Sequence, residues 1–229
     1  MISAIVLTKN EEKPIETCLK SLKFCNEIIV IDSGSKDKTL SIAGKYTDQI
    51  YKETFTNFSN LRNIGKERAK FDWLLYIDAD EEVTKELQDE IIKTIESSNS
   101  DINCFYLERR NYYLGKEWPV KDKVERLFQK KSLVKWYGDV HESPEIDGNK
   151  GYMKNSLIHR THNSLEEMLV NTIDWSDFEA RARFKIKHPK ITWWRIMRMM
   201  TTSFWDSCFK QKGYTLRVEG LIESTYQAF

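Results

Sequence analysis

The 229-residue sequence has no long apolar run and almost no net charge, and each absence removes a class of protein. No stretch approaches the roughly 18 uninterrupted apolar residues of a membrane-spanning helix. The opening MISAIVLTKNEE lacks both a basic region and a long apolar core, so we expect a strand there and not a signal peptide. A net charge of +1 at pH 7 provides no overall field for binding nucleic acid.

Cysteine is scarce and shows neither a disulfide framework nor a zinc site. The four cysteines, Cys18, Cys25, Cys104 and Cys208, form no C-x-x-C pair. Free thiols in a reducing cytoplasm are the simplest interpretation. We therefore expect a cytoplasmic protein, with peripheral contact to the inner face of the cytoplasmic membrane left open.

A dinucleotide-binding glycine motif is also missing, although the first half of the chain alternates between strands and helices. No G-x-G-x-x-G follows the first apolar strand, so a dehydrogenase-type fold is not supported. Strands joined by helices of ten or more residues need crossover connections, which predicts an α/β fold with a mainly parallel sheet. We expect strands at 2–8, 27–32, 48–53 and 72–78, and helices at 11–24, 36–46, 57–70 and 84–97.

The pattern changes after about residue 100. Segments 103–115, 124–131, 133–138 and 155–162 are typical of a mixed or antiparallel extension. From Ser164 onward the sequence predicts helices, at 164–187, 191–211 and 216–228. This organisation suggests one domain over 1–163, with halves 1–100 and 101–163, followed by a helical extension over 164–229.

Carboxylates crowd the end of the predicted fourth strand, LLYIDADEE at 74–82. Residues i and i+2 of a strand point to the same side, so we expect Asp78 and Asp80 to reach one site. Hard oxygen ligands suit Mg²⁺ or Mn²⁺. The alternative is a solvated helix start, where Glu81 and Glu82 favour the helix dipole. That alternative explains Asp78 poorly, because the strand is still ending there.

Two other strand ends carry polar residues, Thr8 to Glu11 and Asp32. They should meet Asp78 in one crevice, because ligands in such sheets bind at the carboxyl ends of the strands. Asp32 either accepts a hydrogen bond from a base or ribose, or caps the turn that follows it. Arg62, on the preceding helix, either pairs with a diphosphate, orients an aspartate or is a surface arginine.

Three of the four histidines fall between residues 141 and 162. His141 lies beside Glu142 in the segment DVHESP, which is a candidate general base on a loop or an ordinary polar loop. His159 and His162 end a strand-like segment, and either could complete a metal shell or be structural.

The segment from Arg181 to Lys212 has nine Lys or Arg and a single acid, Asp206. It also contains Trp193, Trp194, Phe204 and Trp205. Such a segment is either an interfacial helix on anionic lipid or a pair of helices packing aromatic side chains onto the core.

Several motifs occur together and in order: LTKNEE, VIDSGSKDKT, LRNIGKERAKFDWLLYIDADEEVT, RLFQKK and DVHES. With them, residues 2 to 165 resemble a family 2 glycosyltransferase of the GT-A fold, and more narrowly the bacterial lipopolysaccharide core β-1,4-glucosyltransferase group. The resemblance implies inverting transfer of a sugar from a nucleotide-diphosphate sugar, most often a UDP-sugar, to a glycan, glycolipid or other hydroxyl acceptor. It makes 1–100 the nucleotide-binding half and 101–163 the acceptor half.

The resemblance also implies roles by position. Glu142, with His141 beside it, falls at the place of the catalytic base, and Asp139 is the alternative. Asp80 and His159 would bind Mn²⁺ or Mg²⁺, with His162 as the alternative to His159. The E-D or D-D base motif and the Q-x-x-R-W motif of many family members are missing, so long processive synthesis is not expected. The implied nucleotide-sugar-binding residues are Thr8, Asn10, Glu11, Asp32, Arg62, Asp78, Ala79 and Arg126.

Two other functions compete with this one. Haloacid-dehalogenase-like phosphatases also carry D-x-D at a strand end, but they place Thr or Val two residues after the second Asp. Here that residue is Glu82, and three strands precede the motif. A non-catalytic membrane-surface or partner-binding module would explain the basic helices and leave Asp78 and Asp80 unexplained.

Overall fold

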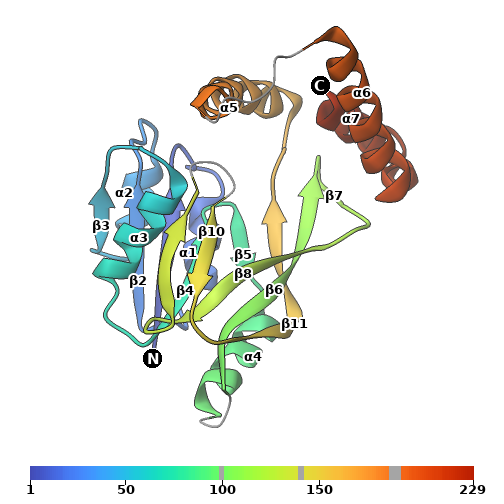
Figure 1. Ribbon diagram of the computed structural model, residues 1–229. Coiled ribbons are helices and arrows are strands. Elements are labelled where there is room, and N and C mark those ends of the chain that lie inside the picture. Colours follow the sequence, from blue (N-terminus) through green and yellow to red (C-terminus); the bar gives the residue numbers. More distant parts are fainter. Residues whose placement is uncertain (98–100, 139–141, 186–191) are drawn as a thin grey trace. The chain divides into compact units, whose positions relative to one another are not determined.

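The computed structural model of the chain describes residues 1–97, 101–138, 142–185 and 192–229 (Figure 1). Its strands are β1 Ile2–Thr8, β2 Glu27–Asp32, β3 Ile50–Lys52, β4 Trp73–Asp78, β5 Glu81–Val83, β6 Ile102–Tyr113, β7 Lys116–Glu117, β8 Asp122–Gln129, β9 Leu133–Tyr137, β10 Ser143–Ile146 and β11 Asn149–Arg160. Its helices are α1 Ile15–Ser21, α2 Thr39–Ala43, α3 Phe58–Arg68, α4 Lys85–Glu96, α5 Leu165–Lys185, α6 Trp193–Trp205, the π-helix η1 Asp206–Lys210, the 3₁₀-helix η2 Gly213–Leu216 and α7 Arg217–Ala228.

The chain forms two compact units. The first contains Met1–Arg109 and Lys123–His159. The second contains Arg110–Asp122 and Arg160–Phe229. Strands β6 and β11 therefore contribute residues to both units.

The main sheet is parallel in its first half, as the alternation of strands and helices predicts. Strands β3, β2, β1 and β4 are adjacent and parallel, and the described strands continue the order as β8, β6, β11 and β5. Strand β8 pairs antiparallel with β4, and β5 pairs antiparallel with β11. A separate hairpin joins β9 and β10. The expected α/β fold with a mixed extension and C-terminal helices is confirmed.

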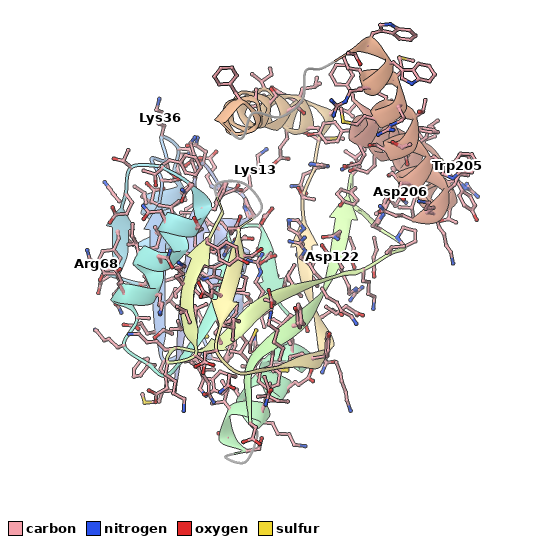
Figure 2. All side chains as sticks on the ribbon, in the orientation of Figure 1. Lys13, Lys36, Arg68, Asp122, Trp205 and Asp206 are labelled. Atoms are coloured by element: carbon pink, nitrogen blue, oxygen red, sulfur yellow. The ribbon has the colours of Figure 1, made fainter. Side chains whose placement is uncertain are left out.

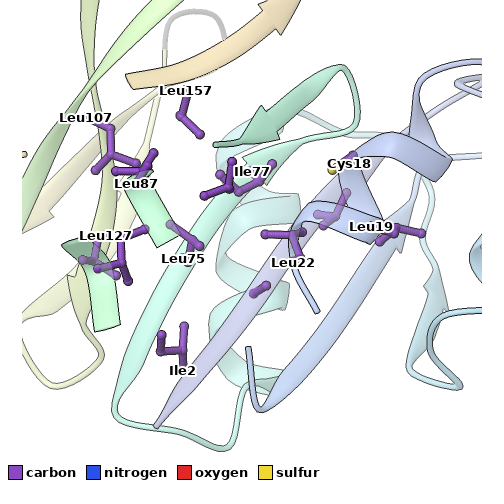
Figure 3. Packing of buried hydrophobic residues seen from close by; sticks show 14 of the residues in the cluster. Ile2, Cys18, Leu19, Leu22, Leu75, Ile77, Leu87, Leu107, Leu127 and Leu157 are labelled. Carbon is purple, nitrogen blue, oxygen red and sulfur yellow. The ribbon is translucent and has the colours of Figure 1, made fainter. Parts of the chain in front are cut away.

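Helices cover the parallel strands, so β1 is buried along its whole length. Its even-numbered residues pack with α1, α2 and α4, in the cluster whose close-up includes Ile2, Leu19 and Leu87 (Figure 3). Its odd-numbered residues pack with Leu61 of α3 and Trp136 of β9. The two clusters take up the apolar side chains of the strands, so polar side chains such as Asp32 and Asp78 lie at the carboxyl ends of the strands.

Side chains cap the two longer helices of the first hundred residues. Asn57 accepts a hydrogen bond from the Asn60 N–H at 2.8 Å and begins α3. Thr84 accepts from the Leu87 N–H at 3.2 Å and begins α4. Such caps satisfy N–H groups that have no partner inside the helix.

Helix α3 approaches β1 so closely that Gly65 has no room for a side chain. A Cβ at this position would lie 2.4 Å from Cγ2 of the buried Ile5. We expect Gly65→Ala to lower the free energy of unfolding by about 1–3 kcal/mol, because overpacking forces a β-branched neighbour or the helix to shift. Gly44→Ala is the matched control, since its Cβ would contact only the Leu40 carbonyl oxygen at 3.5 Å. Urea melts that rank the two variants equally would contradict the tight α3–β1 contact.

Several elements differ from the expected ones. Helix α1 is shorter than 11–24, and the helix expected at 191–211 divides into α6 and the π-helix η1. Strands β5 and β10 were not expected, because both contain glutamate and β10 contains Pro144. Pairing with β11 and β9 determines their conformation, which outweighs weak local propensity. No helix in the described ranges is long and apolar enough to cross a membrane.

Candidate active site

Arg62 of α3 joins two carboxylates that are far apart in the sequence. Its Nη2 lies 3.1 Å from Oδ1 of Asp78, at the end of β4. Its Nε donates to Oε1 of Glu142 at 3.0 Å. The guanidinium is buried and stacks near the Trp136 ring, 4.9 Å from its centroid. This packing leaves Arg62 little freedom, so it holds Glu142 beside the end of β4.

Arginine side chains also contact two of the four crowded carboxylates at the end of β4 and after it. Arg126 of β8 contacts Asp78 and lies 2.8 Å from Glu81, and Arg109 of β6 lies 3.2 Å from Glu81. Burial alone would raise the pKa of Asp78, but the charges of Arg126 and Arg62 outweigh it and hold this pKa well below its usual value. Asp78 and Glu81 therefore have protein cations as partners.

Asp80 is different, because its contact is with a histidine. Its Oδ2 lies 3.0 Å from Nε2 of His159. The antiparallel register of β5 and β11 pairs His159 with Glu81, next in sequence to Asp80, and so places the imidazole there. Burial lowers the pKa of His159, but the hydrogen bond to Asp80 and the negative charges of Asp80 and Glu81 raise it above its usual value.

No group of three or more His, Cys, Asp or Glu side chains in the described part of the chain is arranged to hold a metal ion. A carboxylate and an imidazole are nevertheless adjacent at Asp80 and His159. Mg²⁺ is commonly bound by one or two carboxylates together with substrate phosphates, so a site with few protein ligands is compatible with this ion.

The turns after β1 and β2 are tied together by hydrogen bonds. Asp32 accepts from the N–H groups of Gly34 and Ser35, each at 3.1 Å, so its contacts are those of a turn-capping aspartate. Asn10 has a φ of 58° and accepts from the Lys36 N–H at 2.8 Å. The Glu11 N–H donates to Thr39 at 2.8 Å.

The structure brings together only part of the set expected from the sequence. Arg62, Asp78, Arg126 and Glu142 form one network, and Asp80 meets His159. Asp80 lies in a turn after β4 has ended, so strand alternation does not place it as expected. Ala79 packs in the core, and Thr8 is buried with its hydroxyl lacking a partner among the described residues. His141 and Asp139 lie outside the described residues.

Three further observations bear on the sequence interpretation. Glu81 does not begin a helix but is buried in β5, where Arg109 and Arg126 contact it. Arg109 was not expected at the site, and only the pairing of β6 with its neighbours could have indicated it. His162 pairs with Glu223 at 3.0 Å inside the second unit, which is a structural contact and not one to Asp80.

The chain is similar to known glycosyltransferases along most of its length. An uncharacterized glycosyltransferase of Rickettsia bellii is 30% identical over 100% of the chain and 82% of its own length. The lipopolysaccharide core biosynthesis glycosyltransferase LpsC of Rhizobium meliloti is 26% identical over 78% of the chain and 70% of its own length.

Solved structures show the same fold. S. aureus TarS 1–349 in complex with UDP-GlcNAc has a TM-score of 0.52 at 17% identity, covering 97% of this chain and 79% of TarS. Glucosyl-3-phosphoglycerate synthase from Mycobacterium tuberculosis, in complex with Mg²⁺ and UDP, has a TM-score of 0.50 at 17% identity, covering 73% of this chain and 74% of the synthase. The fold is thus of the GT-A type. The family model "Glycosyl transferase family 2" matches residues 3–161, and the chain belongs to this family.

Proposed function

We propose that the protein transfers a sugar, with inversion at the anomeric carbon, from a UDP-sugar to a hydroxyl group of a bacterial surface glycan such as lipopolysaccharide. The single observation that carries this proposal is the Arg62 guanidinium, which contacts both Asp78 and Glu142. UDP-GlcNAc in the complex with TarS supports the donor class. The name of LpsC supports the acceptor class.

Glu142 is the proposed base. One carboxylate oxygen accepts from Arg62, and the side chain is 18% exposed, so the group is positioned and still reaches solvent. It would take the proton of the acceptor hydroxyl while that oxygen bonds to the anomeric carbon. Attack from the face opposite the departing diphosphate inverts the centre. Arg62 is a positioning residue in this scheme.

Asp80 and His159 would hold Mn²⁺ or Mg²⁺. The Asp80 side chain is 26% exposed, and one of its oxygens already lies against the imidazole, so both donors can face one ion. Such an ion supplies positive charge to the departing diphosphate. The Mycobacterium tuberculosis synthase in complex with Mg²⁺ and UDP supports this assignment. Asp78 fits a metal less well, because its two oxygens contact Arg62 and Arg126.

The remaining assignments follow from position. Thr8, Asn10, Glu11 and Asp32 would surround the nucleoside with Ala79. The Arg62–Asp78–Arg126 network would lie beside the diphosphate. The proposed transferase domain covers 1–163 and the helical extension 164–229, although Arg110–Asp122 and residues 160–163 belong to the same compact unit as the extension. We propose that the protein acts on the cytoplasmic side of the membrane.

Isothermal titration with UDP tests the donor and metal assignments together. We expect UDP to bind in the presence of Mn²⁺ and about tenfold or more weakly after Asp80→Asn, because the Asp80 carboxylate would hold the ion that supplies positive charge to the diphosphate. Asp89→Asn is the matched control, since Asp89 is exposed and contacts only Lys85 among the described side chains. UDP binding that ignores both Mn²⁺ and Asp80 would contradict the metal site. Phosphatase turnover without UDP binding would favour the haloacid-dehalogenase alternative.

A further inference from the structure

Helix α6 presents its large apolar side chains to solvent. None of its residues is buried. Trp194 and Trp205 are 65% and 58% exposed, and in η1 and η2 Phe209 and Tyr214 are 45% and 56% exposed. We call these four side chains the aromatic stripe. These four side chains are therefore not packed inside the second unit, whereas Phe204 of α6 is half-buried.

The four rings of the stripe follow one another along α6, η1 and η2. Trp194, Arg198, Thr201 and Trp205 follow one another at intervals of four, three and four residues, so they share one side of α6. The Trp205 ring lies 4.5 Å from that of Phe209, and Phe209 lies 6.4 Å from Tyr214, measured between centroids. Figure 2 shows Trp205 projecting outward from α6.

Another side of the same segment is already occupied. Ser207 and Cys208 of η1 are buried, and Ser207 contacts Ser224 of α7 at 3.2 Å. The contact with α7 therefore uses small side chains, and the tryptophans are left outside it. Contiguous exposed apolar surface of this kind marks an interaction site.

The charges around the stripe indicate the partner. From Thr192 to Val218 the sequence has five Lys or Arg and one acid. That acid, Asp206, is paired with Lys210 at 2.9 Å. Arg198, between the two tryptophans, makes no ion pair with any described residue. Tryptophan and arginine on one side of a helix that is too short and polar to span a bilayer are typical of a helix lying in the lipid headgroup region.

We propose that the aromatic stripe binds the surface of an anionic lipid bilayer, with Trp194 and Trp205 among the headgroups and Arg198 against their phosphates. The inference does not depend on the proposed reaction, because it concerns only side chains of the second unit. A lipid-attached acceptor would then be held near the enzyme by the same surface.

Co-sedimentation of the full chain with vesicles tests the proposal. We expect binding to vesicles of phosphatidylcholine with 30% phosphatidylglycerol, and much weaker binding to phosphatidylcholine alone. Trp194→Ala with Trp205→Ala should weaken binding by about tenfold or more, since exposed aromatic anchors supply the apolar contact. Arg198→Glu should weaken it by at least about fivefold, the equivalent of one charge near an anionic surface. Raising the salt from 0.1 M to 0.5 M should have the same direction of effect.

Two matched variants control for general effects of lost rings and charges. Tyr152→Ala removes a ring that is 64% exposed in the first unit, and Lys93→Glu reverses an exposed charge on α4. Both should bind like the unaltered chain, and circular dichroism melts should show all variants folded. Equal binding by the stripe variants and the controls would overturn the proposal. A second result would also overturn it: the chain does not bind vesicles, and light scattering shows self-association that the stripe variants abolish. The stripe would then join two copies of the chain.

Discussion

Glu142→Gln is expected to lower the turnover number by a factor of about 10²–10⁴, the usual contribution of a general base. Glutamine keeps an oxygen that can accept from Arg62, so the network around Asp78 should persist. Affinity for UDP should therefore change little, and a loss of turnover with binding retained identifies a group that acts in the transition state. The measurement is UDP release from the nucleotide sugar that gives the highest rate in a screen of donors.

Glu145→Gln is the control for this experiment. Glu145 lies three residues further along, on β10, where it is half exposed and 3.6 Å from Lys135. The Glu145→Gln variant should have a turnover number within about twofold of the unaltered chain, because surface substitutions usually have small effects. If Glu142→Gln turns over normally, the base lies elsewhere, and Asp139 becomes the next candidate.

Arg126→Met is expected to cost about 3–5 kcal/mol of unfolding free energy, the usual result of removing one partner from a buried ion pair. Arg126 is 5% exposed and contacts both Asp78 and Glu81. Methionine fills much of the volume but leaves Glu81 with Arg109 alone and Asp78 with Arg62 alone. Chemical denaturation followed by circular dichroism measures the change.

A second substitution separates charge from packing in this test. Arg126→Met combined with Glu81→Gln should regain part of the lost stability, because the amide still accepts from the Asp78 N–H while one of the two buried negative charges that lost Arg126 is gone. Arg68→Met is the surface control, since Arg68 of α3 (labelled in Figure 2) is exposed and its guanidinium lies over the Tyr51 ring, not against a buried carboxylate. If the double variant is no more stable than Arg126→Met, packing around the guanidinium and not its charge supports the site.

The parallel half of the sheet could be predicted from the sequence because it depends on local patterns. Continuous apolar segments such as residues 2–8 can be buried only between two layers, and the helices between them impose parallel order. The positions of Asp32 and Asp78 at strand ends follow from the same pattern. Arg62 was expected on the helix before the acidic strand, and orientation of an aspartate was one of its three possible roles.

The rest depends on pairings between distant segments, which a single sequence does not encode locally. Glu81 lies in an acidic segment typical of the start of a helix, yet pairing with β11 places it in a strand. The partnership of Arg62 with Glu142 spans 80 residues, and that of Asp80 with His159 spans 79. The crowding of carboxylates at 78–82 suggested a metal ion as their counter-charge. At Asp78 and Glu81 the counter-charges are arginine side chains instead.

The pairing of β5 with β11 makes this part of the chain intolerant of changes in length. His159 meets Asp80 only while Leu157 stays opposite Val83. Because successive side chains of a strand alternate between faces, one residue inserted between these points would send the imidazole to the wrong side of the sheet. A residue added at the turn around Gly148, before the strand begins, would leave the imidazole where it is. We therefore expect an inserted residue to be accepted in such turns and not within the paired part of β5 or β11.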